Sequence, residues 1–265
     1  MTIGSNDSFK LGRALSSSTS QINSSFNKLS SGKRINSASD DAAGMAIVNA
    51  LGADVITSLQ GARNASDGIS ITDMADSALS QISDITSRQG ELAAQASNGT
   101  LSDDQRSTLN AEYQQLDQEK SRIMSTTQFN GVSVFSGSTI QVGTDGNSTS
   151  QIQLPGVDAS AISNAADIST QAGAQSAIDS VKTSIDNLSK ARGEIGSVAT
   201  RVDIAENGAR NNAVEFEVAA SRIRDVDVAD EVSKLVGAQI RQQSTVALGA
   251  QTGKLNADMV SKLLG

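Results

Sequence analysis

Residues 181–223, VKTSIDNLSKARGEIGSVATRVDIAENGARNNAVEFEVAASRI, decide the fold of this chain. Positions separated alternately by four and three residues, starting at Val181, carry almost only apolar or alanine side chains, and Arg192 and Glu206 are the exceptions. A coiled-coil seam has an apolar side chain about every 3.5 residues. The stretch therefore predicts one long helix that packs on another along a narrow seam, with the two charges setting its register or facing a partner.

Two shorter stretches, residues 71–96 and 109–123, have the same spacing. The connection between them, SNGTLSDDQR (residues 97–106), contains Asn98-Gly99 as a helix stop and Ser102 as a helix cap. Asp103 and Asp104 follow the cap, where negative charge favours the positive end of the helix dipole, so we interpret them as a cap and not as a metal pair. The pattern predicts an antiparallel helical hairpin.

Composition supports a mainly α fold made of thin helix-on-helix seams. The 265 residues are 37% hydrophobic but only 2% aromatic, with a single proline. Few large side chains make a thick layered core unfavourable, and proline is excluded from helix interiors. The expected architecture is a bundle of long helices.

Charge and hydropathy exclude several partners. The net charge is -8 and the isoelectric point is about 4.6, so neither a nucleic-acid backbone nor an anionic lipid surface would attract the chain. No uninterrupted apolar run reaches the ~18–20 residues of a membrane span. The start, MTIGSNDSFK, lacks the basic and apolar regions of a cleavable signal peptide. We expect no nucleic-acid partner and no membrane partner.

The sequence contains no cysteine and no histidine. It therefore lacks thiol nucleophiles, disulfides, the commonest general base and the commonest ligands of zinc. No nucleophile-elbow, phosphate-loop or dinucleotide motif replaces them. We expect no enzyme activity, no cofactor and no metal site.

Residues 128–156 have a different pattern. Short runs rich in Val, Ile, Phe and Thr alternate with Ser136-Gly137 and with Thr144-Asp145-Gly146-Asn147. Period-two alternation between glycine turns predicts a β-hairpin or small meander. Pro155 stands where the pattern ends, as expected at a strand edge.

Both ends of the chain are amphipathic but poor in large apolar residues. The N-terminal arm has a sparse seam at positions 11, 15, 18, 22, 25 and 29, and the C-terminal segment from Val232 carries Leu235, Val236, Ile240, Val246, Leu248, Leu255, Met259, Val260, Leu263 and Leu264. With so few apolar residues, the free energy gained by burial does not offset the conformational entropy lost when the arms become ordered. The arms are expected to need partners beyond their own chain.

The stretch LSSGKRINSASDDAAG (residues 29–44) separates the N-terminal arm from the next helix. Ser30-Ser31-Gly32 is expected to end the arm. Asn36-Ser37 with Asp40 resembles a capping box, and Asp40 and Asp41 favour the dipole of the following helix. The stretch predicts a joint between two separately packed helices.

Residues 29–51, LSSGKRINSASDDAAGMAIVNAL, strongly resemble the N-terminal signature of bacterial flagellin. So do NASDGISITDMADSALSQI (64–82), ELAAQASNGTLSDDQR (91–106) and TQFNGVSVF (127–135), while IRDVDVADEVSKLVGAQIRQQSTVALGAQ (223–251) resembles its C-terminal signature. The start MTIGSNDSFKLG and the tail TGKLNADMVSKLLG depart from the commonest family pattern. The residues between Phe135 and Ala177 are too few for a large variable domain, so the resemblance is to a short flagellin.

The resemblance implies an inner domain, residues 1–32 and 232–265, in which the two arms pair as a coiled coil. It implies an outer helical-bundle domain over residues 33–231, including the joints and the hairpin region. The implied function is that of a structural subunit that polymerises into the extracellular filament used for swimming. A hook-filament junction protein of the same superfamily is the alternative, and an enzymatic filament with a zinc protease is excluded because the chain has no histidine.

The same resemblance implies partners. These are other copies of the chain, the hook-filament junction and cap proteins, an export chaperone and the flagellar type III export apparatus. The vertebrate toll-like receptor for flagellin is a further partner, through the matching positions Arg88, Leu92 and Glu112; the alternative is that Leu92 is a seam residue and the other two are solvated charges.

A cluster of hydroxyl side chains in the hairpin region could accept O-linked glycans, or could be ordinary turn composition. Its members are Ser136, Ser138, Thr139, Ser148, Thr149 and Ser150.

Overall fold

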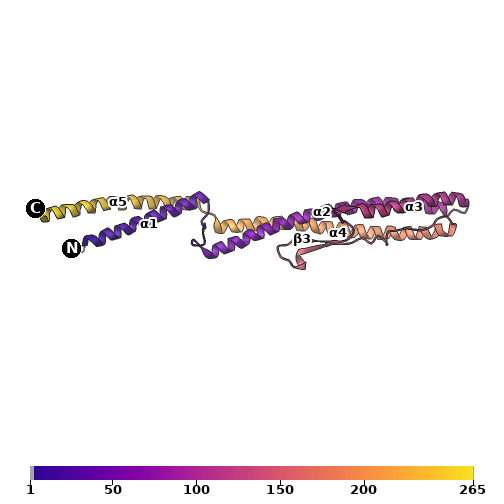
Figure 1. Cartoon of the computed structure of the whole chain (residues 1–265), viewed down its shortest axis with the longest axis horizontal. Coiled ribbons are helices and arrows are strands. Elements are labelled where there is room, and N and C mark those ends of the chain that lie inside the picture. Colours follow the sequence, from indigo (N-terminus) through magenta and orange to yellow (C-terminus); the bar gives the residue numbers. More distant parts are fainter. Residues whose placement is uncertain (1–2, 265) are drawn as a thin grey trace. The chain divides into compact units, whose positions relative to one another are not determined.

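The computed structural model describes the backbone of residues 3–264 and the side chains of residues 9–255, 257–258 and 261–262 (Figure 1). The helices are α1 (Ile3–Ser31), α2 (Ala42–Ala96), α3 (Asp103–Thr126), α4 (Gln171–Arg224) and α5 (Val228–Leu264). The strands are β1 (Gln128–Phe129), β2 (Val132–Ser133), β3 (Ser138–Gln141) and β4 (Gln151–Leu154), and a 3-10 turn (Ser148–Ser150) precedes β4. The mainly α prediction is confirmed.

Contacts divide the chain into two compact units. The terminal unit comprises the residues up to 53 and those from 215 onward, and the central unit comprises residues 54–214. These units are defined by contacts within one chain. The assignment of residues 1–32 and 232–265 to an inner layer and of residues 33–231 to an outer layer of a filament stays a prediction.

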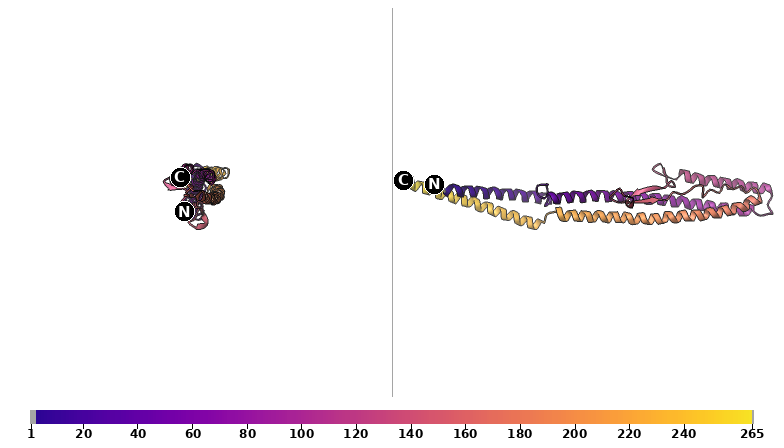
Figure 2. Two further views of the ribbon diagram at one scale, coloured as in Figure 1. Left: turned by 90° about the vertical axis from the view of Figure 1, so that its right-hand side faces the viewer. Right: turned by 90° about the horizontal axis from the view of Figure 1, so that it is seen from below.

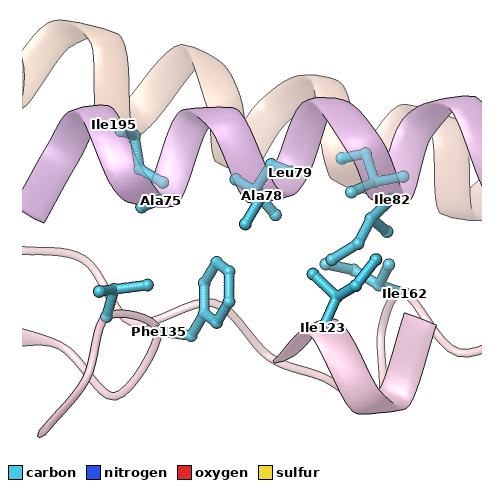
Figure 3. Close-up of a cluster of buried hydrophobic side chains, with 10 residues drawn as sticks. Ala75, Ala78, Leu79, Ile82, Ile123, Phe135, Ile162 and Ile195 are labelled. Carbon is cyan, nitrogen blue, oxygen red and sulfur yellow. The ribbon is translucent and has the colours of Figure 1, made fainter. Parts of the chain in front are cut away.

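In the central unit, α2, α3 and α4 share an apolar core. Leu79 and Ile82 of α2 pack with Ile123 of α3 and with Leu188 of α4. Figure 3 shows Phe135, from the connection after β2, facing this group. The seam predicted from Val181 onward is confirmed, because every position of that series is buried or half-buried. The series over residues 71–96 is buried or half-buried as well.

The predicted helical hairpin is confirmed at the turn between α2 and α3. Ser102 caps α3: its Oγ accepts from the backbone N–H of Gln105, whose side chain accepts from the backbone N–H of Ser102. The buried Arg106 side chain donates to the carbonyl oxygens of Ala96 (3.0 Å) and Asn98 (3.2 Å). These bonds satisfy carbonyls that the end of α2 leaves without helical partners.

The predicted β region forms two antiparallel pairs in place of one continuous sheet. Strands β1 and β2 are joined by Asn130 (φ 49°) and Gly131 (φ 80°), the conformation that a two-residue hairpin turn requires. Strands β3 and β4 pair over four residues each and place Ile140 and Ile152 in a cluster with α2 and α4. Gly61 of α2 permits this approach, since an added Cβ would lie 2.3 Å from the carbonyl oxygen of Val142.

In the terminal unit, α1 and α5 lie side by side and antiparallel (Figures 1 and 2). The sparse seam of α1 is confirmed, with Ser18 and Ser25 buried and Leu15 the only member that is exposed. On α5 the positions that are buried or half-buried at seam spacing are 231, 235, 238, 242, 245 and 249. Apart from Leu235 they are charged, polar or small residues.

The large apolar residues of α5 do not occupy this seam. Val232, Val236, Ile240, Val246, Leu248 and Leu255 are exposed, and only Leu235 among the predicted set is half-buried. The predicted residues Met259, Val260, Leu263 and Leu264 lie outside the side chains that the structure describes. The side of α5 that meets α1 is thus a different side from the one that its large apolar residues suggested.

Candidate functional site: surfaces for self-assembly

An apolar stripe runs along the exposed side of α5. Val228, Val232, Val236 and Ile240 follow one another at intervals of four residues, and Ile240 is 58% exposed. Residues four apart lie on one side of a helix. Each such side chain forgoes ~25 cal/mol per Å² of apolar surface left in water. The stripe is a packing surface without a partner in the described part of this chain.

The other arm exposes large side chains too. Phe9 is 62% exposed and Phe26 is 55% exposed, although the whole chain has only five phenylalanines. Both members of the α1–α5 pair therefore present apolar surface outward.

Helix α2 begins with a third exposed apolar surface. An 18-residue window of this helix has a mean hydropathy of 1.5, and 17% of the window is buried. By length and composition alone the helix could cross a membrane, although the sequence has no uninterrupted apolar run. Ile47 is 50% exposed and Ile56 is 68% exposed. A helix that packs against another protein has the same composition, and the comparisons below favour that explanation.

The exposed apolar side chains are not spread evenly. In the described part of the chain, none of the exposed large hydrophobic residues lies between residues 75 and 131, where α2 and α3 form their hairpin. Over the same range Leu79, Ile82, Leu92 and Tyr113 are fully buried. This part of the molecule completes its own packing, whereas the arms, the start of α2 and the second half of α4, where Ile204 and Val214 are exposed, do not.

The joint between α1 and α2 is held by backbone hydrogen bonds to the joint between α4 and α5. The N–H of Arg34 donates to the carbonyl of Arg224 (2.6 Å), and the N–H of Val226 donates to the carbonyl of Gly32 (3.1 Å). Lys33 and Asp225 form an isolated antiparallel bridge between these bonds. The sequence predicted a joint after residue 29 but gave no sign that a second segment pairs with it.

Two neighbouring aspartates organise the first joint. Asp40 Oδ2 accepts from the backbone N–H groups of Asn36 (3.0 Å) and Ser37 (2.9 Å), and these bonds hold the pKa of Asp40 below its usual value. Asp41 Oδ1 accepts from the N–H of Gly44 (2.9 Å) at the start of α2. The predicted capping box at Asn36-Ser37 was therefore wrong in its detail: Asp40 closes a turn, and Asp41 caps the helix.

Charged residues singled out from the sequence have partners within the chain. Arg192 Nε lies 2.8 Å from Asp76 Oδ1 on α2, and Glu206 pairs with Arg210 one turn later (2.6 Å). Asp103 pairs with Arg106 (3.1 Å). Among the described residues, no group of three or more His, Cys, Asp or Glu side chains could hold a metal ion.

The three residues proposed for receptor binding differ in exposure. Arg88 lies half-exposed between Glu91 (2.8 Å) and Glu112 (3.0 Å), and the hydrogen bonds that it donates to these carboxylates raise the pKa of Arg88. The Leu92 side chain is 1% exposed and packs against Tyr113. Arg88 and Glu112 are thus accessible together, whereas Leu92 occupies the seam position that the alternative interpretation gave it.

The hydroxyl cluster lies around β3 and β4. Ser136, Thr139, Ser148 and Thr149 are exposed, whereas Ser138 and Ser150 are half-buried. The Ser150 hydroxyl bonds the Asp145 carboxylate. Four of the six predicted acceptors are therefore exposed residues, and the hydroxyl of one of them, Ser136, donates to the carbonyl of Ser133 (2.8 Å).

Sequence reasoning missed two buried charges. Lys120 is buried in α3: its Nζ lies 3.3 Å from Asp117 and 3.2 Å from the carbonyl of Ile162, and burial lowers the pKa of Lys120. Glu231 is 5% exposed and accepts a hydrogen bond from Ser25. The seam-like spacing of 231, 235, 238, 242, 245 and 249 could have revealed the second, since small and polar residues also obey that period.

These features define a helical structural protein whose arms and α2 start leave apolar surface for association. Comparison with known families agrees. The bacterial flagellin N-terminal helical region matches residues 6–139, and the bacterial flagellin C-terminal helical region matches residues 178–264. The chain belongs to the bacterial flagellin family.

Individual relatives are similar to this chain in length and in fold. A flagellin of Halalkalibacterium halodurans is 38% identical over 234 residues, which is 86% of each chain. Flagellin FlaB2 of Treponema pallidum is 29% identical over 272 residues, 95% of each chain. The crystal structure of Bacillus cereus flagellin has a TM-score of 0.50 at 28% identity and covers 56% of this chain and 88% of its own. This is a short flagellin without a large variable domain.

The family settles the general function. The chain is a structural subunit that polymerises with copies of itself into a bacterial flagellar filament, and it is not an enzyme. The alternative of a hook-filament junction protein is not favoured. The filament that flagellins form is extracellular.

Proposed function

We propose that the chain assembles head to tail, with residues 1–32 and 232–265 forming the inner layer of the filament and residues 33–231 the outer layer. Each copy would offer one surface to a different surface of the next copy, so that the contacts do not close and a tube grows. The uneven distribution of exposed apolar residues supports this proposal most strongly. The stripe on α5 and the exposed side chains of α1 are the surfaces that neighbouring copies would cover.

The arms of a free subunit would be only partly ordered. The α1–α5 seam buries mainly serine, alanine and one glutamate, so that little apolar surface offsets the entropy lost on folding. Contact with neighbouring copies would supply the missing burial. Such coupling keeps free subunits from associating before they reach the growing end.

The test compares hydrogen exchange of dilute subunits with that of filaments. We expect fast exchange over α1 and α5 and slow exchange over residues 75–131 in the subunit, and slow exchange throughout in the filament. Equal protection of arms and centre in the dilute subunit would refute the proposal. A paired assay measures seeded polymerisation: Val236→Asp should abolish growth, because it places a charge in the stripe, whereas Gln118→Asp on exposed α3 should grow normally.

Export through the flagellar type III apparatus suits a chain without cysteine, since no disulfide hinders threading of the unfolded polypeptide. The proposed export chaperone would cover the apolar stripe of α5 until the chain is exported. Removal of residues 232–265 should abolish copurification with the chaperone while leaving the α2–α3 hairpin folded, as judged by its hydrogen exchange. The hook-filament junction and the cap would meet the two ends of the growing filament.

The toll-like receptor proposal now rests on Arg88 and Glu112. Their side chains form one exposed ion pair, so that removing Arg88 also frees Glu112. Arg88→Ala should lower receptor activation by purified monomer at unchanged thermal stability. Arg122→Ala is the matched control, because Arg122 is also exposed and also paired with a glutamate, Glu119 (2.5 Å). Equal activation by both variants and the unmodified protein would exclude a role for Arg88.

Glycosylation is proposed at the exposed hydroxyls Ser136, Thr139, Ser148 and Thr149. Ser138 and Ser150 are weaker acceptors because they are half-buried. The intact mass of protein from native filaments should exceed the sequence mass by whole sugar units. A mass equal to that of the sequence would refute this proposal.

A further inference from the structure

The seam between α1 and α5 has an unusual composition for a helix pair. The residues buried along it are Ser18 and Ser25 of α1, with Glu231 and Ala238 of α5. Apolar side chains normally hold such seams together, and a polar side chain at a core position lowers stability but specifies register. Glu231 is such a polar side chain, because it is only 5% exposed.

The Glu231 carboxylate is held by one hydrogen bond across the helix pair. Ser25 Oγ donates to Glu231 Oε1 at 2.6 Å, and Lys234 Nζ lies 3.6 Å from Glu231 Oε2 within α5 itself. Of the two contacts of the Glu231 carboxylate, only the one with Ser25 crosses from α5 to α1. A buried carboxylate that lost this donor would leave its oxygen without compensation for the water it gave up.

A slide of one helical turn would remove this contact. The seam neighbours of Ser25 on α1 are Ile22 and Leu29, three and four residues away, and neither offers a donor from its side chain. The backbone bonds between the two joints also oppose a slide, but they hold only the end of the helix pair next to the joints and do not depend on side-chain type. Two further side-chain hydrogen bonds cross the pair, from Arg241 to Gln21 (2.8 Å) and from Gln242 to Thr19 (3.0 Å), but both are exposed to solvent.

We propose that the Ser25–Glu231 hydrogen bond is the specificity-determining contact that selects the register of α1 against α5. A polar pair at this position buries less apolar surface than two apolar side chains would, but it allows only one alignment of the two helices. The inference rests on the pairing of the two arms in the filament proposed above. It adds that one buried side-chain pair, and not the apolar residues of the arms, decides how the arms are aligned.

Engineered disulfides can report the register, since the chain has no cysteine of its own. An added Cβ at Gly249 would lie 2.7 Å from Leu11 Cδ2, so Leu11→Cys with Gly249→Cys reports the observed alignment. Leu11→Cys with Thr245→Cys, or with Gly253→Cys, reports a slide of one turn in either direction. Filaments are oxidised and dissolved, and disulfides within one chain are separated from those between chains by electrophoresis without reductant.

We expect the observed alignment to dominate in otherwise unchanged filaments and in Glu231→Gln, whose side-chain oxygen still accepts from Ser25. Glu231→Leu should raise the ratio of slid to observed disulfides about tenfold, because a leucine is accepted equally well beside Ile22 or Leu29. Val232→Leu, one residue away on the exposed stripe, is the matched control and should leave the ratio unchanged.

Two results distinguish the possible failures. An unchanged ratio in Glu231→Leu would overturn the register proposal while leaving arm pairing intact. Absence of every disulfide within or between chains in otherwise unchanged filaments would instead refute arm pairing, and with it the register proposal.

Discussion

Tyr113 offers the sharpest test of the central unit. Its side chain is 0% exposed and packs with Leu92 and Ile168, yet its hydroxyl has no hydrogen-bond partner among the described residues. The Gln89 side chain donates to the backbone carbonyl of Tyr113 and not to the hydroxyl, so substitution of the side chain leaves that bond in place. The change Tyr113→Phe removes the hydroxyl alone.

The expected magnitude follows from the cost of an unpaired buried hydroxyl, ~1–3 kcal/mol. Loss of the oxygen leaves a small void that offsets part of the gain. We expect Tyr113→Phe to raise the free energy of unfolding by about 1 kcal/mol, which corresponds to a rise of about 2–4 °C in Tm for a chain of this size.

The assay is urea unfolding of unassembled protein followed by far-UV circular dichroism. The matched variant is Ser184→Ala, because the Ser184 hydroxyl is also buried but pairs with the side-chain amide of Asn164 at 2.5 Å. Its free energy of unfolding should fall by about 1 kcal/mol. The reasoning fails if Tyr113→Phe loses stability by a similar amount, since the hydroxyl would then contribute a favourable interaction.

Three further predictions concern titration and capping. Burial, assisted by the Asp117 carboxylate, raises the pKa of Tyr113 to about 12. The ultraviolet absorbance of this single tyrosine should therefore change near that pH in the folded protein and about two pH units lower in denaturant. The free energy of unfolding should fall as the pH rises between the two values, because the unfolded chain loses its proton first. Backbone N–H groups lower the pKa of Asp40, so the stability that its carboxylate gives the joint is present above the usual pKa of 3.8 and is lost as the pH falls through the lower pKa of the folded protein. Amide exchange at Ser37 should accelerate at that lower pH, and Asp40→Asn should remove this pH dependence. Ser102→Ala deletes the cap of α3 and should cost ~1 kcal/mol in urea unfolding, whereas Ser107→Ala, exposed on the same helix, should cost far less.

Much of the central unit could be predicted because its signals are local or periodic. The seam from Val181 onward needs only the period of a helix, and the cap at Ser102 needs only the three residues that follow it. The turn at Asn130-Gly131 is specified by the backbone conformations that these two residues tolerate. The same reasoning misplaced the cap of α2: it expected a capping box at Asn36-Ser37, whereas Asp40 closes a separate turn there and Asp41 caps the helix.

The candidate surfaces were less predictable. The sequence showed that the arms contain few large apolar residues. It did not show which of these residues stay exposed to solvent. Leu92 is the opposite case, a residue that the sequence suggested as an exposed contact and that the structure buries. Only its packing against Tyr113 shows that it is covered.

The amino-acid sequence by itself determined the long helices, their stops and caps, the turn residues of the hairpins and the family, because each depends on neighbours a few residues away or on an unbroken periodic pattern. Only the tertiary structure decided that α5 meets α1 through Glu231 and Ala238, that the two joints pair through Arg34 and Arg224, and that Lys120 lies buried beside Asp117. The physical reason is that these choices are competitions between alternative faces of the same helix. Their outcome depends on contacts between residues far apart in the chain, which no local pattern contains.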